Sequence, residues 1–158
     1  MGTPPEPDGG RRQLPRQSPA GLATRPGPPI LRRWSERIAR DAFRYYPTLT
    51  LVRTYVEEHL HDPAAITMKE VARVVSYDYR YFSRYFKDKV GLGFPEWLRL
   101  MQVDRAAHLL AHSHVSVEQV AHDAGFRSVR TLQRAFKRFC GLTPAEFRSN
   151  GPHVSRRP

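Results

Sequence analysis

The feature that most constrains this chain of 158 residues is an internal duplication. The stretch ITMKEVA at residues 66–72 matches VSVEQVA at residues 115–121, an offset of 49. In each copy a hydroxyl residue is followed three positions later by Glu or Gln, which is the capping box of a helix N-terminus. Apolar residues on both sides occupy the hydrophobic-staple positions. These agreeing local signals predict two copies of one helical unit.

A turn and a second helix are predicted to follow in each copy. Asp78 and Ser128 are typical N-cap residues for the second helices, and Gly91 and Gly141 are typical stops. Each unit then has a helix of about 8 residues, a turn of about 3 and a helix of about 10, which is the helix-turn-helix pattern. We expect an all-α fold with these units at about residues 67–88 and 116–139. A helix over residues 94–111 would join them and be about 27 Å long.

The second helix of each unit carries polar and basic residues on its outward face. Helical spacing predicts outward positions for Tyr79, Arg80, Ser83, Arg84 and Lys87 in the first unit, and for Arg130, Gln133, Arg134 and Lys137 in the second. Arg, Gln and Ser can read base edges in the major groove, and Lys suits phosphate. The net charge of +11 also favours a polyanionic partner. A merely solvated basic face is the alternative for either helix alone.

The composition changes near residue 30. Residues 1–29 hold 8 of the 14 Pro and 5 of the 10 Gly, so we expect a disordered tail. Residues 30–47 are predicted to hold an amphipathic lead helix that Pro47 ends, and residues 48–149 the domain itself. A second disordered tail is expected at 150–158. The lead helix should pack on the domain, although a membrane surface would also suit it. Its apolar face would comprise Ile30, Trp34, Ile38, Ala42 and Tyr45.

Residues 49–148 resemble the AraC/XylS family of bacterial transcription regulators. The motifs that carry the resemblance are AHDAGF at 121–126, LQRAFK at 132–137, GLTPAEFR at 141–148 and FSRYFKDKVG at 82–91. The resemblance implies a seven-helix domain that inserts both second helices into the major groove on one face of DNA. It implies that Val129 joins the outward residues named above as base-facing, and that Lys87 and Lys137 meet phosphate.

The resemblance therefore implies a sequence-specific regulator of transcription that binds double-stranded DNA as a monomer. RNA polymerase is a candidate second partner, and the bacterial cytoplasm, at the nucleoid, is the expected location. Only 48 residues precede the match and ten follow it, so we expect a stand-alone binder or a shortened relative without a sensor domain. The alternative function is an interaction module that binds another regulator or the polymerase and touches DNA weakly.

Two positions depart from the family pattern. Ser76 stands where the family often has Gly in the first turn, and a left-handed Ser would cost about 1 kcal/mol. Gln102 stands in the connecting helix where the family usually has Arg, which puts a backbone contact or an ion pair of that helix in doubt.

Other candidate sites are weak. His108, His112 and His114 lack the accompanying Glu or Cys of a zinc motif, and Cys140 is expected to be a packed residue. No pair of acidic residues indicates catalysis. We therefore expect no metal, no cofactor and no enzyme activity. There is also no apolar stretch long enough to span a membrane and no secretory signal.

Overall fold

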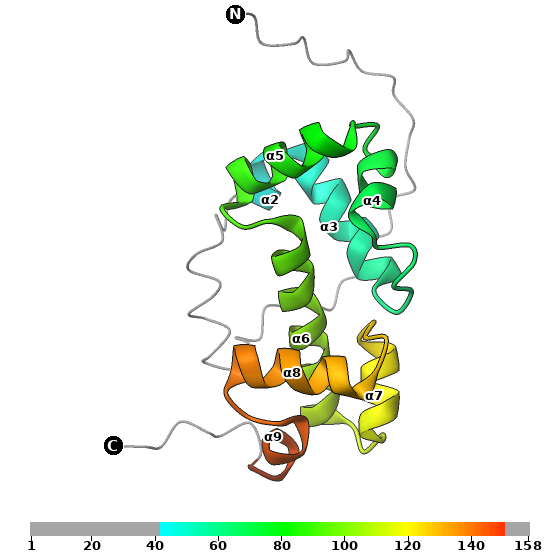
Figure 1. The fold of residues 1–158 in the computed structure, drawn as a ribbon, viewed down its shortest axis with the longest axis vertical. Helices are drawn as coiled ribbons and strands as arrows, with labels where there is room; N and C mark the ends of the chain where they lie inside the picture. Colours follow the sequence, from blue (N-terminus) through cyan, green and yellow to red (C-terminus); the bar gives the residue numbers. More distant parts are fainter. Residues whose placement is uncertain (1–41, 151–158) are drawn as a thin grey trace, which may run out of the picture.

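The computed structural model describes residues 42–150, and within that range the chain is helical and has no strand (Figure 1). The expected all-α fold is confirmed. The predicted tail at 1–29, the lead helix up to residue 41 and residues 151–158 lie outside the described residues. The helices are α2 (Ala42–Tyr45), α3 (Pro47–His59), α4 (Met68–Val74), α5 (Tyr79–Val90), α6 (Phe94–His112), α7 (Val117–Asp123), α8 (Val129–Cys140) and α9 (Pro144–Asn150).

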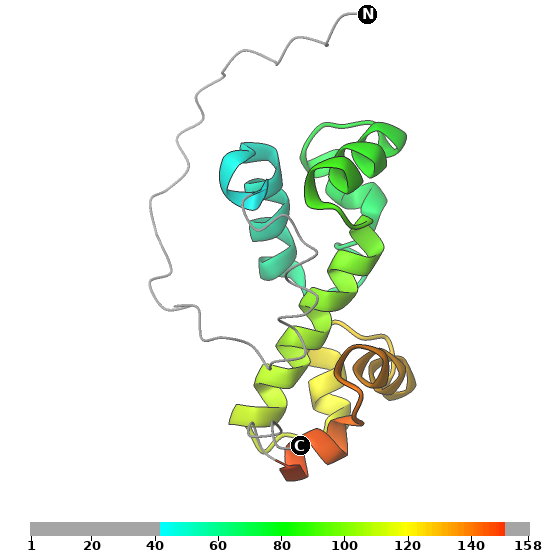
Figure 2. The same ribbon diagram turned by 90° about the vertical axis from the view of Figure 1, so that its left-hand side faces the viewer.

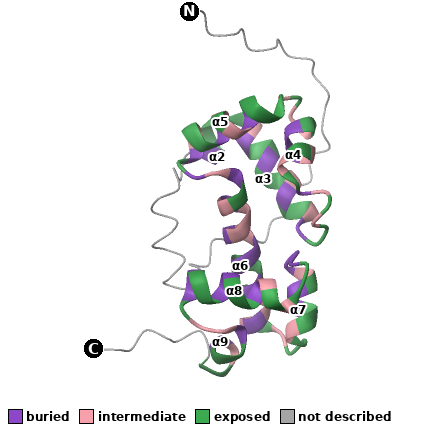
Figure 3. Cartoon of the chain, in the orientation of Figure 1, coloured by how far each residue is buried: buried purple, intermediate pink, exposed green. Residues whose placement is uncertain are grey.

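The helices form two lobes, and the long helix α6 belongs to both (Figures 1 and 2). The first lobe comprises α2 to α5 and the start of α6; its core contains Phe94 and Trp97 from α6. The second lobe comprises the rest of α6 and α7 to α9; its core contains Val103 and Leu110 from α6. Exposed and buried residues alternate along α5 and α8, as expected for helices with one face in a core (Figure 3).

The helix starts of the duplication are where the sequence predicts them. The Thr67 hydroxyl accepts a hydrogen bond from the backbone N–H of Glu70 at 3.3 Å, and the Ser116 hydroxyl accepts one from Gln119 at 3.1 Å. The return half of each capping box is not formed among residues 42–150. Instead, Glu70 forms a salt bridge with Arg73 at 2.7 Å, and the Gln119 amide bonds one turn further along its own helix. The capping-box motif therefore predicts where each helix begins, but it does not predict which group the Glu or Gln side chain bonds.

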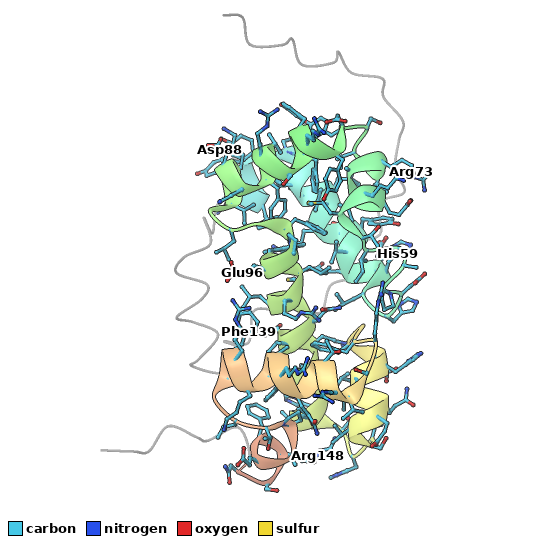
Figure 4. All side chains as sticks on the ribbon, in the orientation of Figure 1. His59, Arg73, Asp88, Glu96, Phe139 and Arg148 are labelled. Carbon is cyan, nitrogen blue, oxygen red and sulfur yellow. The ribbon has the colours of Figure 1, made fainter. Side chains whose placement is uncertain are left out.

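A complete capping box occurs at α9, within the segment that the sequence analysis quoted only as the motif GLTPAEFR. The Thr143 backbone N–H donates to the Glu146 carboxylate at 2.7 Å, and the Glu146 N–H donates to the Thr143 hydroxyl at 3.2 Å. Arg148, labelled in Figure 4, donates from α9 to the Val115 carbonyl before α7 at 2.6 Å. The capping box fixes the start of α9, and the Arg148 bond ties α9 to the segment before α7.

The predicted apolar face of the lead helix is wrong at Tyr45, which is 72% exposed. Ala42 is buried as predicted, but the aromatic residue that packs is Phe43, with its ring stacked 5.3 Å from Trp97. Successive helical residues are about 100° apart, so Tyr45 points away from the side that Phe43 presents. Pro47 opens α3 after the break at Tyr46. The single turn α2 therefore belongs to the first lobe, where Ala42 and Phe43 are part of the core.

The turn of the first unit has a left-handed residue, as the sequence analysis considered. Ser76 has φ 57°, the only positive φ among the described residues other than glycines. At the matching position of the second unit, Gly125 has φ 76°. The first turn therefore retains a strain that glycine would relieve.

Replacing Ser76 with Gly should raise the free energy of unfolding by about 0.5–1 kcal/mol, because the steric cost of a left-handed side chain exceeds the added chain entropy of glycine. Urea denaturation of the full chain measures the change. Ser76→Ala is the matched control, since it keeps the Cβ atom and should bring no gain. Equal stability of the two variants would contradict the strain.

Candidate nucleic-acid interface

The second helices of the two units, α5 and α8, lie on the same side of α6. They run roughly parallel in Figure 1 and are both seen nearly end-on in Figure 2, with α2 and α3 on the opposite side. Each helix buries one face in its own lobe and turns the other outward. The fold therefore presents two exposed helical faces in one direction.

The outward face of α8 is basic. Arg130, Gln133, Arg134 and Lys137 are exposed, while Val129 is half-buried and packs against the core of the second lobe. The opposite face of the helix is fully committed to the core through Leu132, Ala135, Phe136, Phe139 and Cys140. The chemistry available to a partner on α8 is therefore that of guanidinium, ammonium and amide groups.

The outward face of α5 is less basic and carries an aromatic ring. Tyr79, Arg80, Arg84 and Lys87 are exposed, and Ser83 is half-buried. Four of these residues line one shallow, open depression: Tyr79, Arg80, Ser83 and Arg84. The structure thus brings together all the outward residues predicted for the first unit except Lys87, which lies one turn further along.

The arginines on these faces have no acidic partner. Within residues 42–150, no salt bridge involves Arg80, Arg84, Arg130 or Arg134. By contrast, Arg138 on α8 contacts Glu96 of α6 at 3.5 Å and lies over the Phe139 ring. Glu96 and Phe139 lie on the same side of α6 in Figure 4. The described salt bridges therefore leave the arginines of the two outward faces available to an anionic partner.

The structure also places the histidines and the cysteine that the sequence analysis set aside as candidate sites. His108 and His112 stack 4.5 Å apart, and residues 42–150 contain no group of three His, Cys, Asp or Glu that could hold a metal ion. Cys140 is 2% exposed, which confirms it as a packed residue. Burial, with a smaller contribution from the Asp104 charge, raises the pKa of its thiol to about 12, so the thiolate is scarce at neutral pH. No helix of the described part is long and apolar enough to cross a membrane.

A groove between the lobes was not anticipated from the sequence. It has a volume of about 360 Å³, and its lining includes Met68, Leu98, Arg99 and Arg127. Arg99 is half-buried there, with its guanidinium 5.3 Å from the centre of the Phe126 ring, and burial lowers its pKa. In the sequence, Arg99 is a basic residue one turn before Gln102 on the predicted connecting helix. Helical spacing alone cannot distinguish a half-buried arginine there from a solvent-exposed one.

The doubt about Gln102 is resolved in favour of an internal contact. Its side chain is buried and donates a hydrogen bond to the Gly125 carbonyl at 2.7 Å, while its own carbonyl accepts one from Arg99 at 2.9 Å. Gln102 therefore faces the second lobe, where its side chain is buried and hydrogen-bonded within the protein.

An all-helical domain with two helix-turn-helix units and exposed basic second helices on one face belongs to the class of DNA-binding proteins. A protein-family model described as "Helix-turn-helix domain" matches residues 71–150, about half of the chain. The DNA-binding domain of AdpA, solved in complex with a target DNA, matches with a TM-score of 0.62 and 32% identity over 66% of this chain and 93% of that one. The chain belongs to the AraC/XylS family of helix-turn-helix transcription regulators.

Other relatives agree. The uncharacterized HTH-type transcriptional regulator YfiF of Bacillus subtilis is 31% identical over 101 residues, which is 64% of this chain and 31% of YfiF. The regulatory protein PocR of Salmonella typhimurium is 31% identical over 94 residues, which is 60% of this chain and 30% of PocR. The C-terminal domain of the response regulator AraT from Geobacillus stearothermophilus has the same fold, with a TM-score of 0.65 at 23% identity over 73% of this chain and 94% of that one. The match covers 31% of YfiF and 30% of PocR, and as little as 13% of other curated relatives.

Proposed function

We propose that this chain binds double-stranded DNA with sequence specificity and regulates transcription, with α5 and α8 in adjacent major grooves. The observation that carries the proposal is the pair of parallel helices, α5 and α8, whose outward faces lie on the same side of α6. The arginines of these faces form no salt bridge within residues 42–150; they are Arg80, Arg84, Arg130 and Arg134. The AdpA domain, at 32% identity, was solved on its target DNA, which supports the same use of the fold here.

The proposed roles follow from side-chain chemistry. Arginine forms paired hydrogen bonds with guanine, glutamine pairs with adenine, and serine, tyrosine and valine can meet base edges or thymine methyl groups. Lysine near a helix end suits phosphate. The base-facing residues are then Tyr79, Arg80, Ser83, Arg84, Val129, Arg130, Gln133 and Arg134, and the phosphate contacts are Lys87 and Lys137.

The length of α6 fits a monomer that spans two grooves. Its 19 residues correspond to about 28 Å at 1.5 Å per residue. Successive major grooves on one face of DNA are about 34 Å apart, so a small bend or tilt would let both helices enter. One chain then provides both half-site readers, and dimerisation is not required.

The rest of the proposal concerns the whole protein. The role is non-enzymatic and needs no metal or cofactor, and the protein acts in the bacterial cytoplasm at the nucleoid. RNA polymerase is the proposed second partner.

A selection experiment tests the proposal directly. The full chain is incubated with a random duplex library in buffer of about 150 mM salt, since phosphate contacts dominate at low salt, and the retained DNA is sequenced. A bipartite motif with half-sites about one helical turn apart supports two readers in one chain. A motif for one half only would assign reading to a single unit. Bulk retention without a motif would contradict sequence specificity.

Failure to retain any DNA would favour the interaction module instead. One observation favours that alternative: the first lobe exposes large apolar residues along the α2–α3 segment and on α5. Each is at least 37% exposed; they include Tyr45, Tyr46, Leu51 and Tyr81. Exposed aromatic residues are frequent at protein interfaces. The two functions therefore predict opposite results in the same selection.

Replacing Lys137 with Ala should weaken binding to all DNA sequences about equally and reduce the slope of log affinity against log salt by roughly one, because one phosphate contact is lost. Anisotropy titrations at several salt concentrations measure both quantities. Arg53→Ala is the control, since Arg53 pairs with Glu57 on α3, outside the proposed interface. A loss confined to one sequence would contradict a phosphate role for Lys137.

A further inference from the structure

We propose that Gln102 is a positioning residue that locks the two helix-turn-helix units into one relative orientation, and so determines which half-site spacing the protein accepts. The inference rests on the proposed function for its DNA readout, but the lock itself is a property of the protein alone. It is carried by the hydrogen bonds of Gln102 and by the close approach of Gly125 to Leu60.

Gln102 is the only buried polar or charged residue among residues 42–150, with 4% of its surface exposed. Both ends of its amide are bonded: the NH₂ group donates to the Gly125 carbonyl and the oxygen accepts from Arg99. A carbonyl only accepts and a guanidinium only donates, so these partners allow one orientation of the amide. A buried amide bonded at both ends holds its neighbours in place, because breaking either bond leaves a buried group unsatisfied.

Gln102 holds Gly125, which lies at a close contact between the two lobes. Gly125 lies in the turn between α7 and α8, and a Cβ atom added there would be 1.9 Å from the Leu60 carbonyl oxygen at the end of α3. The end of α3 and the turn before α8 lie next to each other in Figure 1. Gln102 thus ties the second unit to α6 at the place where the first lobe abuts it.

The two lobes otherwise have separate cores that share only α6 among the described helices. A long helix can curve gently along its length, so a contact beside α6 adds to the restraint on the two lobes. Arg138 of α8 also pairs with Glu96 near the start of α6 at 3.5 Å, but this pair is exposed and exposed pairs contribute little. The buried contact at Gly125 therefore adds a restraint on the angle between α5 and α8, beyond the packing of each lobe on α6.

A rigid connection makes affinity depend on spacing. Two linked readers bind together with an advantage that is lost when the geometry prevents simultaneous contact. One added base pair moves a half-site by about 3.4 Å and turns it by about 35° around the helix axis. A locked protein should reject such a site, whereas a loosened protein should tolerate it and bind the best site less tightly.

The variants are Gln102→Met, which removes both bonds, and Gln102→Glu, which keeps an acceptor for Arg99 but loses the donor to Gly125. Gln119→Met is the matched control, because the Gln119 amide bonds to Asp123 within α7 and lies away from the contact between the lobes. The DNA probes are the selected bipartite site, the same site with one base pair added or removed, and each half-site alone.

We expect the full-length wild type and Gln119→Met to lose at least about tenfold in affinity when the spacing changes by one base pair. Both Gln102 variants should lose about tenfold on the natural spacing and no more than about threefold further on the altered ones. Their affinity for each half-site should stay within about twofold of wild type, because neither reading face has changed. Gln102 variants that keep the wild-type spacing dependence would overturn the proposal.

A measurement without DNA separates failure of the lock from failure of the proposed function. Residual dipolar couplings of the ¹⁵N-labelled chain report the orientation of α5 relative to α8. The wild type should fit one alignment tensor for both lobes, and the Gln102 variants should need two. A single tensor in Gln102→Met and Gln102→Glu would overturn the lock even if DNA binding is absent. Wild-type protein that fits one tensor but binds no DNA would overturn only the function.

Discussion

Replacing Gly125 with Ala should lower the free energy of unfolding by at least about 3 kcal/mol. The backbone at Gly125 has φ 76°, where an L side chain costs about 1–2 kcal/mol. The added Cβ would also lie 1.9 Å from the Leu60 carbonyl oxygen and 3.1 Å from the Gln102 amide nitrogen. A backbone oxygen at that distance has to move, so the variant must open the contact between the lobes.

Gly141→Ala is the matched control for this prediction. Gly141 ends α8 with φ 73°, and a Cβ there would have no neighbour within 4 Å. Its substitution should therefore cost only the left-handed backbone term of about 1–2 kcal/mol. Urea unfolding of the two variants, followed by circular dichroism, gives the difference. Equal losses would show that the close approach of Gly125 to Leu60 contributes nothing to stability.

The helices of this fold could be read from the sequence because their signals are local. The Thr67 and Ser116 caps, the Asp78 cap and the glycine stops each involve residues within four positions of one another, and the structure has a helix end at each. Repetition of the unit at an offset of 49 residues removed the ambiguity of any single signal. The left-handed turn at Ser76 was considered for a different reason, because the family that the sequence resembles often has Gly at that position.

The contacts between distant segments could not be read in this way. The bond from Gln102 to Gly125 joins residues 23 positions apart, and the approach of Gly125 to Leu60 joins 65. A glutamine inside a helix gives no local sign that it is buried, and most glutamines are exposed. Phe43 was likewise passed over for Tyr45, because periodicity projected through residues 30–46 does not account for the one-turn α2 and the break at Tyr46.

The candidate interface lies between these cases. Helical spacing separates Leu132 and Phe136, which are buried, from Arg130 and Arg134, which are exposed. Spacing does not show that α5 and α8 face the same way, because that depends on how two lobes are mounted on α6 (Figure 2). Side-chain chemistry and exposure are therefore available from the sequence, and the common direction comes from tertiary structure.

Replacing Arg134 with Ala should weaken binding to the best selected site by about 1–3 kcal/mol, or about five- to 150-fold, and relax the preference at one base position. Arg134 is exposed in the middle of α8, between Gln133 and Lys137, and forms no salt bridge among the described residues. Its guanidinium is therefore free to form the paired hydrogen bonds with guanine that distinguish one base pair from the others. The measurement is an anisotropy titration against the selected site and its single-base variants at about 150 mM salt.

Arg138→Ala is the matched control, since Arg138 has the same charge on the same helix but contacts Glu96 and the Phe139 ring. It should change affinity by no more than about twofold and leave every base preference intact. A similar loss in both variants would mean that α8 contributes only positive charge. Unchanged affinity and preference in Arg134→Ala would remove Arg134 from the base-reading residues, and the specificity of the second unit would then have to come from Arg130 and Gln133.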